Sequence, residues 1–308
     1  MLDKISLKIM SELCRDGRLS NARLAEMLDI SEITVARKIE SLLNEGVIVI
    51  RGIPNPAKMG FKASALIGLK VDLRRIDDIS RQLMDNIHIN LVVNCFGRFD
   101  ILLIVYFQEW TELQRFVKEE LSRIKGINHI DTFLISEARK RNKKVYPDTS
   151  LNQKMEMLDD LDRELVKELV KNGRPSYAQL AERYKVSVST ISRRINALLK
   201  NDLMQVIAIP DPSKLGYMSC AFVLLKVEMD KASKICDELA TYPEVTIIMR
   251  LMNEYDILFG VDTTDQGALY SFFKEKIAFI DGILSSETFI RGNFLYFSAD
   301  AMLLPSLK

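Results

Sequence analysis

Two stretches of the chain place hydroxyl and basic side chains in the same order, at a constant offset of 156 residues (187 − 31). The residues in question are Ser31, Glu32, Thr34, Arg37 and Lys38 in the first stretch, and Ser187, Ser189, Thr190, Arg193 and Arg194 in the second. Each set starts at a serine, a residue that commonly caps the beginning of a helix. Hydroxyl, ammonium and guanidinium groups on the outer face of a helix can contact phosphate oxygens and base edges. The same residues are also compatible with an ordinary solvated helix face.

The two stretches differ in charge. Three acidic and two basic residues lie between Ser31 and Gly46, whereas three basic residues and no acidic one lie between Ser187 and Lys200. Because neutralisation of phosphates requires local positive charge, we expect the second stretch to contribute more of any non-specific affinity for DNA. Glu32 has two interpretations, since its carboxylate can accept from a cytosine amino group or simply repel phosphate.

The elements that position these residues resemble one another in the two halves of the chain. Residues 2–15 carry apolar side chains at a spacing of three and four, which predicts a helix. Gly17 is expected to end this helix in the left-handed conformation. A short helix over 20–28 and a helix from Ser31 to about residue 44 follow, with Val35, Ile39, Leu42 and Leu43 predicted to face inward. Three helices followed by a strand over 47–53 predict a winged helix-turn-helix.

After Gly60 the pattern changes to short apolar strands. We predict strands over 63–71, 89–96, 99–107 and 130–135, with helices over 76–84 and 111–124. This β-α-β-β-α-β order is that of a ferredoxin-like domain, a four-stranded antiparallel sheet with helices on one face. The run 101–105 is apolar throughout, so we expect the second face of the sheet to be covered by another copy of the module.

The whole pattern is then repeated, with matches that include Gly17 and Gly173, Pro54 and Pro210, and Asp100 and Asp256. A repeat of this length indicates two similar modules in one chain. The predicted fold class is α+β, with two copies of a winged helix-turn-helix followed by a ferredoxin-like domain. The predicted divisions are 1–56 and 158–212 for the helix-turn-helix domains, 57–137 and 213–308 for the ferredoxin-like domains, and 138–157 for a basic linker.

Both halves resemble the Lrp/AsnC, or feast/famine, family of transcriptional regulators. The resemblance rests on the LAEMLDIS turn, on the run from Thr34 to Ile48, on the Pro56-x-Lys58-x-Gly60-Phe61 segment, and on Gly97-Arg98-Phe99-Asp100, which resembles the Gly-x-Tyr-Asp turn of the family's small-molecule-binding domain. Members usually carry one such unit and dimerise. The tandem copy therefore implies that one chain does the work of two subunits, with its sheets packed against each other or against those of another chain.

The resemblance implies a sequence-specific regulator whose partner is double-stranded DNA, together with an amino-acid-like effector. It also implies a homo-oligomer formed through the ferredoxin-like domains. The effector-site residues carried over from the motif are Gly97, Phe99, Asp100, Tyr255 and Asp256. The second turn reads Asn253-Glu254-Tyr255-Asp256 and lacks the glycine, which predicts a degenerate second site if that glycine lets a ligand approach the backbone. From the residues alone, each Asp is equally compatible with bonding its own turn backbone.

Composition limits which functions and locations the protein can have. Net charge is +1, from 43 basic and 42 acidic residues, so any DNA binding must depend on local basic patches. The four cysteines are scattered, which indicates thiols in a reducing compartment. With no long apolar run, we expect a cytoplasmic protein that makes no contact with a membrane.

We expect no catalysis, no metal and no cofactor. His88 and His129 have neither metal-ligand spacing nor a nucleophile partner pattern. Two alternatives stay open. One is a fused enzyme similar to the siroheme decarboxylases, which look like this family and use two related subunits. The other is a chromatin-like architectural DNA-binding protein. The basic run 139–144 has two interpretations as well, a solvated linker or a phosphate-contacting tether.

Overall fold

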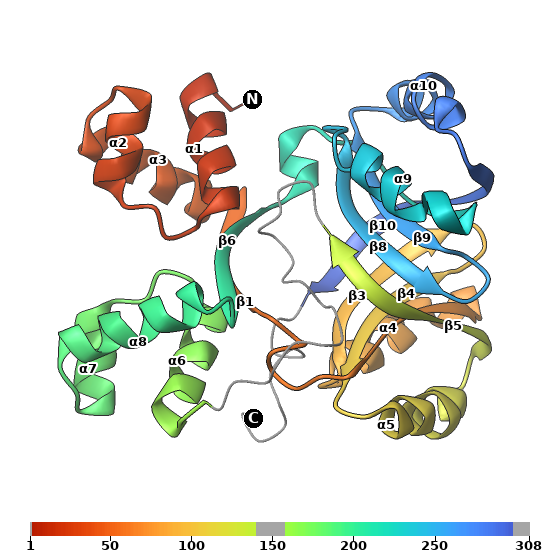
Figure 1. The fold of residues 1–308 in the computed structure, drawn as a ribbon, viewed down its shortest axis with the longest axis horizontal. Coiled ribbons are helices and arrows are strands. Elements are labelled where there is room, and N and C mark those ends of the chain that lie inside the picture. Colours follow the sequence, from red (N-terminus) through yellow and green to blue (C-terminus); the bar gives the residue numbers. More distant parts are fainter. Residues whose placement is uncertain (1, 140–157, 298–308) are drawn as a thin grey trace. The chain divides into compact units, whose positions relative to one another are not determined.

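The structure is a computed structural model that describes residues 2–139 and 158–297 (Figure 1). The chain forms two compact units, and each unit contains a segment from both copies of the repeat. Within the described residues, the head unit comprises 2–55 and 158–216, and the barrel unit comprises 56–139 and 217–297. Copy 1 is the repeat before the linker and copy 2 is the repeat after it.

The head unit holds two three-helix heads. Head 1 contains α1 (Lys4–Arg15), α2 (Asn21–Leu28) and α3 (Glu32–Asn44), and head 2 contains α6 (Asp160–Lys171), α7 (Tyr177–Tyr184) and α8 (Val188–Lys200). Side chains cap all six helices at their first turns: Asp3, Ser20, Ser31, Asp159, Ser176 and Ser187. The apolar stripes face inward and are fully buried, as at Ile9, Leu24 and Val35. The predicted helix-turn-helix is therefore present twice.

The strand that follows each head does not form a wing with its own head alone. β1 (Ile48–Pro54) pairs antiparallel with β6 (Met204–Pro210), so the two heads share one two-stranded sheet, seen between them in Figure 1. The register is symmetric, because Ile48 lies opposite Pro210 and Pro54 lies opposite Met204. Each strand also packs on the first helix of the other head, β6 on α1 and β1 on α6.

Gly17 ends α1 for a different reason from the one the sequence indicated. Its φ is not in the left-handed region. Instead, a Cβ at Gly17 would lie 3.0 Å from the backbone of Ile207 on the strand of the other head. The Gly17 N–H donates to Val206 O at 2.8 Å, and the Gly173 N–H donates to Ile50 O at 2.9 Å in the reciprocal contact. Both glycines therefore allow a close approach between helix end and strand.

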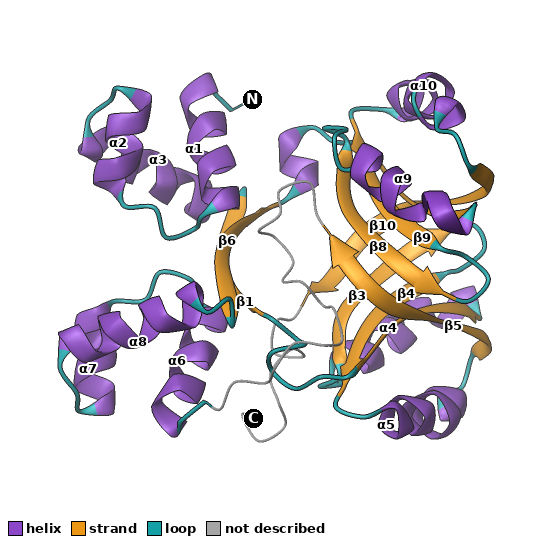
Figure 2. Cartoon of the chain, viewed as in Figure 1, coloured by secondary structure: helices purple, strands orange, loops and turns teal. Residues whose placement is uncertain are grey.

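The barrel unit contains eight strands. In copy 1 these are β2 (Ala63–Val71), β3 (Ile89–Phe96), β4 (Ile101–Phe107) and β5 (Ile127–Arg139), and in copy 2 they are β7 (Ser219–Val227), β8 (Val245–Met252), β9 (Ile257–Thr263) and β10 (Ile283–Phe297). They form a closed barrel in the order β10-β3-β4-β2-β5-β8-β9-β7, shown in orange in Figure 2. The expected ferredoxin-like sheets are thus joined edge to edge within one chain.

Two seams close the barrel, and each joins a strand of copy 1 to a strand of copy 2. At one seam Leu134 of β5 lies opposite Met252 of β8, and at the other Ile290 of β10 lies opposite Phe96 of β3. These two pairings are equivalent under the repeat offset. β5 and β10 are longer than the predicted strands because their outer residues continue the ladder across the seams. The inner face of each sheet is covered by the other copy. Of the two arrangements expected from the sequence, packing within one chain and packing against another chain, the structure shows the first.

Helices cover the outer face of each sheet. They are α4 (Ile76–Met84) and α5 (Trp110–Arg115) in copy 1, and α9 (Ala232–Leu239) and α10 (Gln266–Glu275) in copy 2. One apolar core lies under each helix pair, and each core is completed by aromatic side chains such as Phe116 and Phe272. The predicted helix over 111–124 is interrupted, since Phe116–Glu120 forms a π-helical turn.

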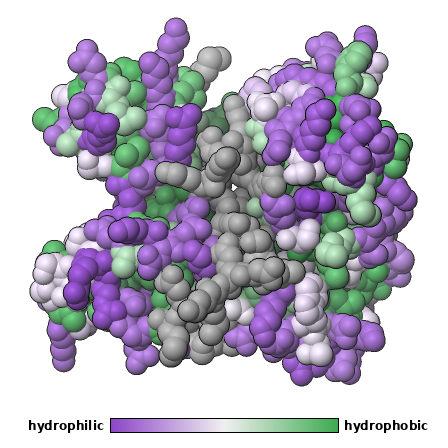
Figure 3. Space-filling model, viewed as in Figure 1, coloured by the Kyte–Doolittle hydropathy of each residue, from purple (hydrophilic) through white to green (hydrophobic). Residues whose placement is uncertain are grey.

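Some predictions need correction or cannot be compared. Leu43 was expected to face inward, but it is exposed because it lies one position beyond the stripe that Leu42 completes. Most of the predicted linker over 138–157, with its basic run, and the tail over 298–308 lie outside the described residues. Within the described part, no helix is long and apolar enough to cross a membrane. On the visible face in Figure 3, hydrophilic and hydrophobic residues are interspersed, and the hydrophilic ones predominate.

The substitution Gly17→Ala should lower the free energy of unfolding by about 1–3 kcal/mol, because the added methyl group must displace the Ile207 backbone. Urea unfolding followed by circular dichroism measures this. Gly267→Ala is the comparison, since a Cβ there would meet only the flexible Asp265 side chain, 3.1 Å from its Oδ1, so the free energy of unfolding should fall by less than it does at Gly17. Equal stability of the Gly17→Ala chain and the parent would contradict the close-approach role.

Candidate nucleic-acid interface and effector turn

The second helix of each turn motif starts with the same capping arrangement. The Ser31 hydroxyl accepts from the Thr34 N–H at 3.2 Å and lies 2.9 Å from the Thr34 hydroxyl. In head 2 the Ser187 hydroxyl accepts from the Thr190 N–H at 3.1 Å. It also lies 2.8 Å from the hydroxyl of Ser189. These hydroxyls therefore hold the helix starts, while Glu32 is exposed at the beginning of α3.

Two of the predicted contact residues are held inside their own heads. Lys38 Nζ lies 2.7 Å from Asp3 Oδ2, the carboxylate that caps α1. The Lys38 ammonium, together with the Ser6 N–H, holds the pKa of Asp3 well below its usual value. At the equivalent position, Arg194 forms ion pairs with Asp159, which caps α6, and with Asp162. Lys38 and Arg194 thus fix the angle between the first and third helices.

The preceding residue in each helix is placed differently. Arg37 and Arg193 are both exposed, and neither forms an ion pair within the described part of the chain. A guanidinium in this setting keeps its donors available for an external anion, whereas one bound to carboxylates does not. Among the predicted basic residues, these two are the ones the structure leaves oriented to solvent.

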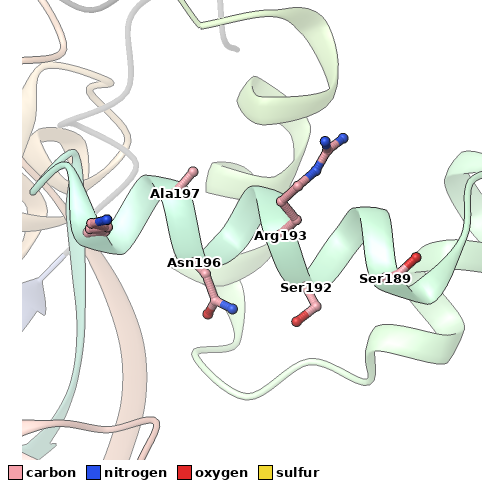
Figure 4. Close-up of a pocket in the computed structure, with 6 residues that line it drawn as sticks. Ser189, Ser192, Arg193, Asn196 and Ala197 are labelled. Carbon is pink, nitrogen blue, oxygen red and sulfur yellow. The ribbon is translucent and has the colours of Figure 1, made fainter.

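Head 2 carries an open hollow along the outer face of α8, and its residues repeat with helical spacing. The lining residues are Ser189, Ser192, Arg193, Asn196, Ala197 and Lys200. In Figure 4 the side chains of Ser192 and Asn196 point the same way from α8, and Arg193 extends from another side of the helix. Ser192, Asn196 and Lys200 were not among the predicted contacts. Helical spacing from Ser189 reaches Ser192, and continuing it reaches Asn196 and Lys200.

Head 1 presents different side chains at the equivalent positions. The residues of α3 that correspond to the hollow are Ile33, Ala36, Arg37, Glu40, Ser41 and Asn44. Ile33 is 82 % exposed, which leaves a large apolar side chain in solvent where head 2 has a serine. Glu40 stands in place of Asn196. The two helices share an arginine and otherwise differ in charge and polarity.

The Gly97–Asp100 turn joins β3 to β4, and its Asp is engaged within the protein. Asp100 Oδ2 accepts from the Val71 N–H at 2.9 Å, and Asp100 Oδ1 lies 2.9 Å from Lys70 Nζ. In copy 2, Asp256 Oδ2 accepts from the Val227 N–H at 2.8 Å. Each carboxylate therefore binds the end of the neighbouring strand, β2 or β7.

The other residues of the predicted effector set lie where the two copies meet. Phe99 is fully buried inside the barrel, with its ring centroid 5.8 Å from that of Phe289 and 6.1 Å from that of Phe133. Gly97 has a φ of 135°. A Cβ there would lie 3.3 Å from the Phe289 Cβ on β10. The glycine thus permits close approach of the other copy's strand, and Asn253, its counterpart, instead donates to Thr132 O at 3.0 Å.

Arg98 connects the two turns. Its Nη2 lies 2.7 Å from Glu254 Oε2 and 2.9 Å from Asp131 Oδ2, and its Nη1 lies 3.2 Å from Glu287 Oε2. The hydrogen bond to Glu254 is the main cause that raises the pKa of Arg98, and the same contact lowers the pKa of Glu254. The three carboxylates exceed the one guanidinium, and the nearby Lys226 ammonium offsets part of this excess negative charge.

The histidines do not converge on any site. The His88 ring stacks on Phe107 at a centroid distance of 4.4 Å, and His129 Nε2 lies 2.9 Å from Asp131 Oδ1. Among residues 2–139 and 158–297, no group of three or more His, Cys, Asp or Glu side chains is arranged to hold a metal ion.

Two helix-turn-helix heads and two ferredoxin-like sheets define a DNA-binding class of protein with a second, regulatory type of domain. Family models agree with this architecture. A winged helix-turn-helix DNA-binding model matches residues 2–49, and an AsnC-type helix-turn-helix model matches 158–199. The Lrp/AsnC ligand binding domain model matches both 64–145 and 220–291. The chain belongs to the Lrp/AsnC family of DNA-binding transcriptional regulators, and it carries both family domains twice.

Similar proteins are about half as long as this chain. An uncharacterized HTH-type transcriptional regulator of Pyrococcus horikoshii is 37 % identical over 134 residues, which is 43 % of this chain and 85 % of the relative. HTH-type transcriptional regulator FL11 of the same organism is 31 % identical over 134 residues, or 43 % of this chain and 88 % of the relative. Each relative thus corresponds to one copy of the repeat.

A solved structure matches over the full length. The siroheme decarboxylase NirDL, crystallised with an iron-uroporphyrin III analogue, aligns with a TM-score of 0.67 at 15 % identity. The alignment covers 97 % of this chain and 96 % of that chain. At this identity the likeness shows a shared fold, and it carries no argument about activity.

The thiol of Cys95 reports on the turn region. It donates to Phe99 O at 3.2 Å, and burial raises its pKa to about 12. Thiolate is the reactive form, so at pH 8 alkylation of native Cys95 should be roughly a thousandfold slower than that of a thiol with the ordinary pKa. Mass spectrometry after timed iodoacetamide treatment measures this, with urea-unfolded chain as the control. Equal rates in both states would contradict the buried placement.

Proposed function

We propose that this chain is a transcriptional regulator whose two heads contact DNA through different chemistries, with head 2 supplying more of the phosphate attraction. The observation that supports this proposal is the contrast between α8 and α3. The outer face of α8 combines Arg193, Asn196 and Lys200 without an acid, whereas α3 places Glu40 and the exposed Ile33 around Arg37. Phosphate binding depends on basic residues that are free to release counterions.

The proposed DNA site is correspondingly asymmetric. A symmetric dimer places identical helices on a palindrome. In this chain Asn196 is a residue type that pairs with adenine, whereas the apolar Ile33 suits contact with a thymine methyl group. We therefore propose two unlike half-sites in the footprint of one chain.

Among the predicted DNA contacts, we assign direct contact to Arg37 and Arg193. Lys38 and Arg194 take a positioning role instead, because both are ion-paired with the first helix of their own head. The serines and threonines at the helix starts are assigned to capping, since the Ser31 and Ser187 hydroxyls accept from the Thr34 and Thr190 N–H groups.

Arg193→Ala should weaken DNA binding more than Arg37→Ala, with a loss of about 1–3 kcal/mol, or roughly five- to a hundredfold in Kd, for the head 2 variant. Mobility shifts on a fixed duplex at two salt concentrations measure this, because loss of a phosphate contact also lowers the salt dependence. Equal losses for the two variants would overturn the assignment of unequal heads.

Arg81→Ala is the control for these variants, since Arg81 is an exposed arginine on α4, outside the head unit, and should leave the Kd unchanged. A random duplex bound as tightly as a selected one, with compaction of long DNA, would support an architectural protein over a sequence-specific regulator.

For the ferredoxin-like domains we propose an amino-acid-like effector that binds where the Gly97 turn meets its counterpart in copy 2. The surplus of carboxylates around Arg98 favours a cationic group such as an ammonium. Two members of the predicted set are not placed to contact a ligand directly. Phe99 is buried, and the Asp100 oxygens bind Lys70 and Val71 at the end of β2. Tyr255 is the member of the predicted set that belongs to the acidic cluster, because its half-buried hydroxyl donates to Glu287 Oε2 at 2.6 Å and accepts from Arg98 Nη1 at 3.2 Å.

Calorimetric titration with the twenty amino acids should give saturable heat for at least one of them, and Tyr255→Phe should weaken that signal by removing one hydrogen bond, worth about 0.5–1.5 kcal/mol. If all twenty titrations are silent, the amino-acid assignment is wrong.

We propose that the chain does not catalyse siroheme decarboxylation. A tetrapyrrole with several carboxylates requires convergent basic or histidine side chains, whereas the two histidines are apart and engaged and the Arg98 cluster is acidic in sum. Adding an iron porphyrin and recording the Soret band tests this proposal. A saturable shift at a ratio of one porphyrin per chain would support the decarboxylase alternative instead.

A further inference from the structure

The Arg98 cluster lies at the place where equivalent positions of the two copies face each other. Arg98 and Glu254 occupy the same position in the repeat, and so do Asp131 and Glu287, since both pairs differ by 156 (254 − 98 and 287 − 131). Equivalent residues meet in this way only near a symmetry axis that relates the copies. In a symmetric pairing of two like copies, a charge at this position faces its own kind.

We propose that Arg98 and Glu254 form a pairing code, by which the pairing of copy 1 with copy 2 is favoured over the two pairings of like copies taken together. The surface that carries this code is the rim of the barrel where the Gly97–Asp100 turn meets the Asn253–Asp256 turn. Its partner is a ferredoxin-like domain that places an acidic residue opposite Arg98. This inference does not rest on DNA binding or on an effector.

The geometry supports direct coupling between the two charges. Arg98 Nη2 and Glu254 Oε2 are 2.7 Å apart, and the Arg98 side chain is only 24 % exposed. The guanidinium carbon lies 5.2 Å from the centroid of the Phe99 ring and 5.4 Å from that of Tyr255. Held between two rings and three carboxylates, this guanidinium has limited freedom to turn outward.

Charge counting shows which pairings the code disfavours. The observed cluster holds Arg98 with Asp131, Glu254 and Glu287, a formal charge of −2 (+1 − 3). If two domains like copy 1 paired, the cluster would contain two arginines and two aspartates, a charge of 0, with the two arginines adjacent. Two domains like copy 2 would gather four carboxylates and no Arg98, a charge of −4. The electrostatic self-repulsion of a cluster grows with the square of its charge. Two clusters of charge −2, one for each unlike pairing, therefore repel less in total than one cluster of charge 0 and one of charge −4.

The seams beside the cluster depend on this choice. The Arg98 turn follows β3, which pairs with β10 of copy 2, and the Glu254 turn follows β8, which pairs with β5 of copy 1. Cys95 lies opposite Arg291 on the first seam, so opening of that seam exposes its thiol. The reactivity of Cys95 under native conditions therefore reports on opening of this seam, and the melting temperature follows overall stability separately.

Charge reversal in the full-length chain tests the code. Arg98→Glu raises the cluster to four carboxylates, so we expect a melting temperature lower by about 5 °C or more and faster alkylation of Cys95. Adding Glu254→Arg restores one cation and three carboxylates with the copies exchanged, and it should recover most of both losses. Light scattering after gel filtration should show species larger than one chain for Arg98→Glu and a return to the parental profile for the double variant.

Arg81→Glu is the control, because Arg81 is paired with Asp78 on the solvent face of α4 and should shift the melting temperature by about 1 °C or less. If Arg98→Glu behaves like this control, or if Glu254→Arg fails to rescue it, the code is refuted. Should Arg98→Glu give no soluble chain, the cycle of Arg98→Gln, Glu254→Gln and both together decides the matter. Coupled losses support the code and additive losses refute it.

Discussion

The architecture depends on one constraint, that backbone groups at a strand edge must find partners. Among the described strands, β1 and β6 pair with each other alone, and the edges of the two ferredoxin-like sheets meet at β5–β8 and β10–β3. In every case the partner comes from the other copy of the repeat. Neither copy satisfies its own edges, so each copy needs a second one, and this chain supplies both.

The backbone preserves the symmetry of the repeat, whereas the side chains break it. The reciprocal bonds from Gly17 to Val206 and from Gly173 to Ile50 are nearly identical in length, at 2.8 Å and 2.9 Å. By contrast, Arg98 faces Glu254, and Ile33 corresponds to Ser189. A repeat in one chain is free to diverge in this way, because a change at one position is not imposed on its counterpart as it is in a homodimer.

Much of the fold could be predicted because its signals are local. Serine caps such as Ser31 and Ser187 set the helix starts, and apolar periodicity identified the six head helices and most strands. What could not be predicted depends on contacts between copies. Nothing local indicated that Gly17 lies against a strand far along the chain, or that the ends of β5 and β10 pair with strands of the other copy. The sequence also could not distinguish the role of Arg37 from that of Lys38, because both are basic residues on one helix. The structure distinguishes them, since Lys38 lies beside Asp3.

The exchange of strands between the copies has a consequence for how the chain is made. β1 ends at Pro54 and its partner β6 begins at Met204, so neither unit can be completed until most of the polypeptide has left the ribosome. Contacts this distant in sequence are slow to form, and unpaired strands are prone to associate with other chains in the meantime. The three-helix heads, whose contacts are local, are able to form first and would keep the growing chain compact until the second copy arrives.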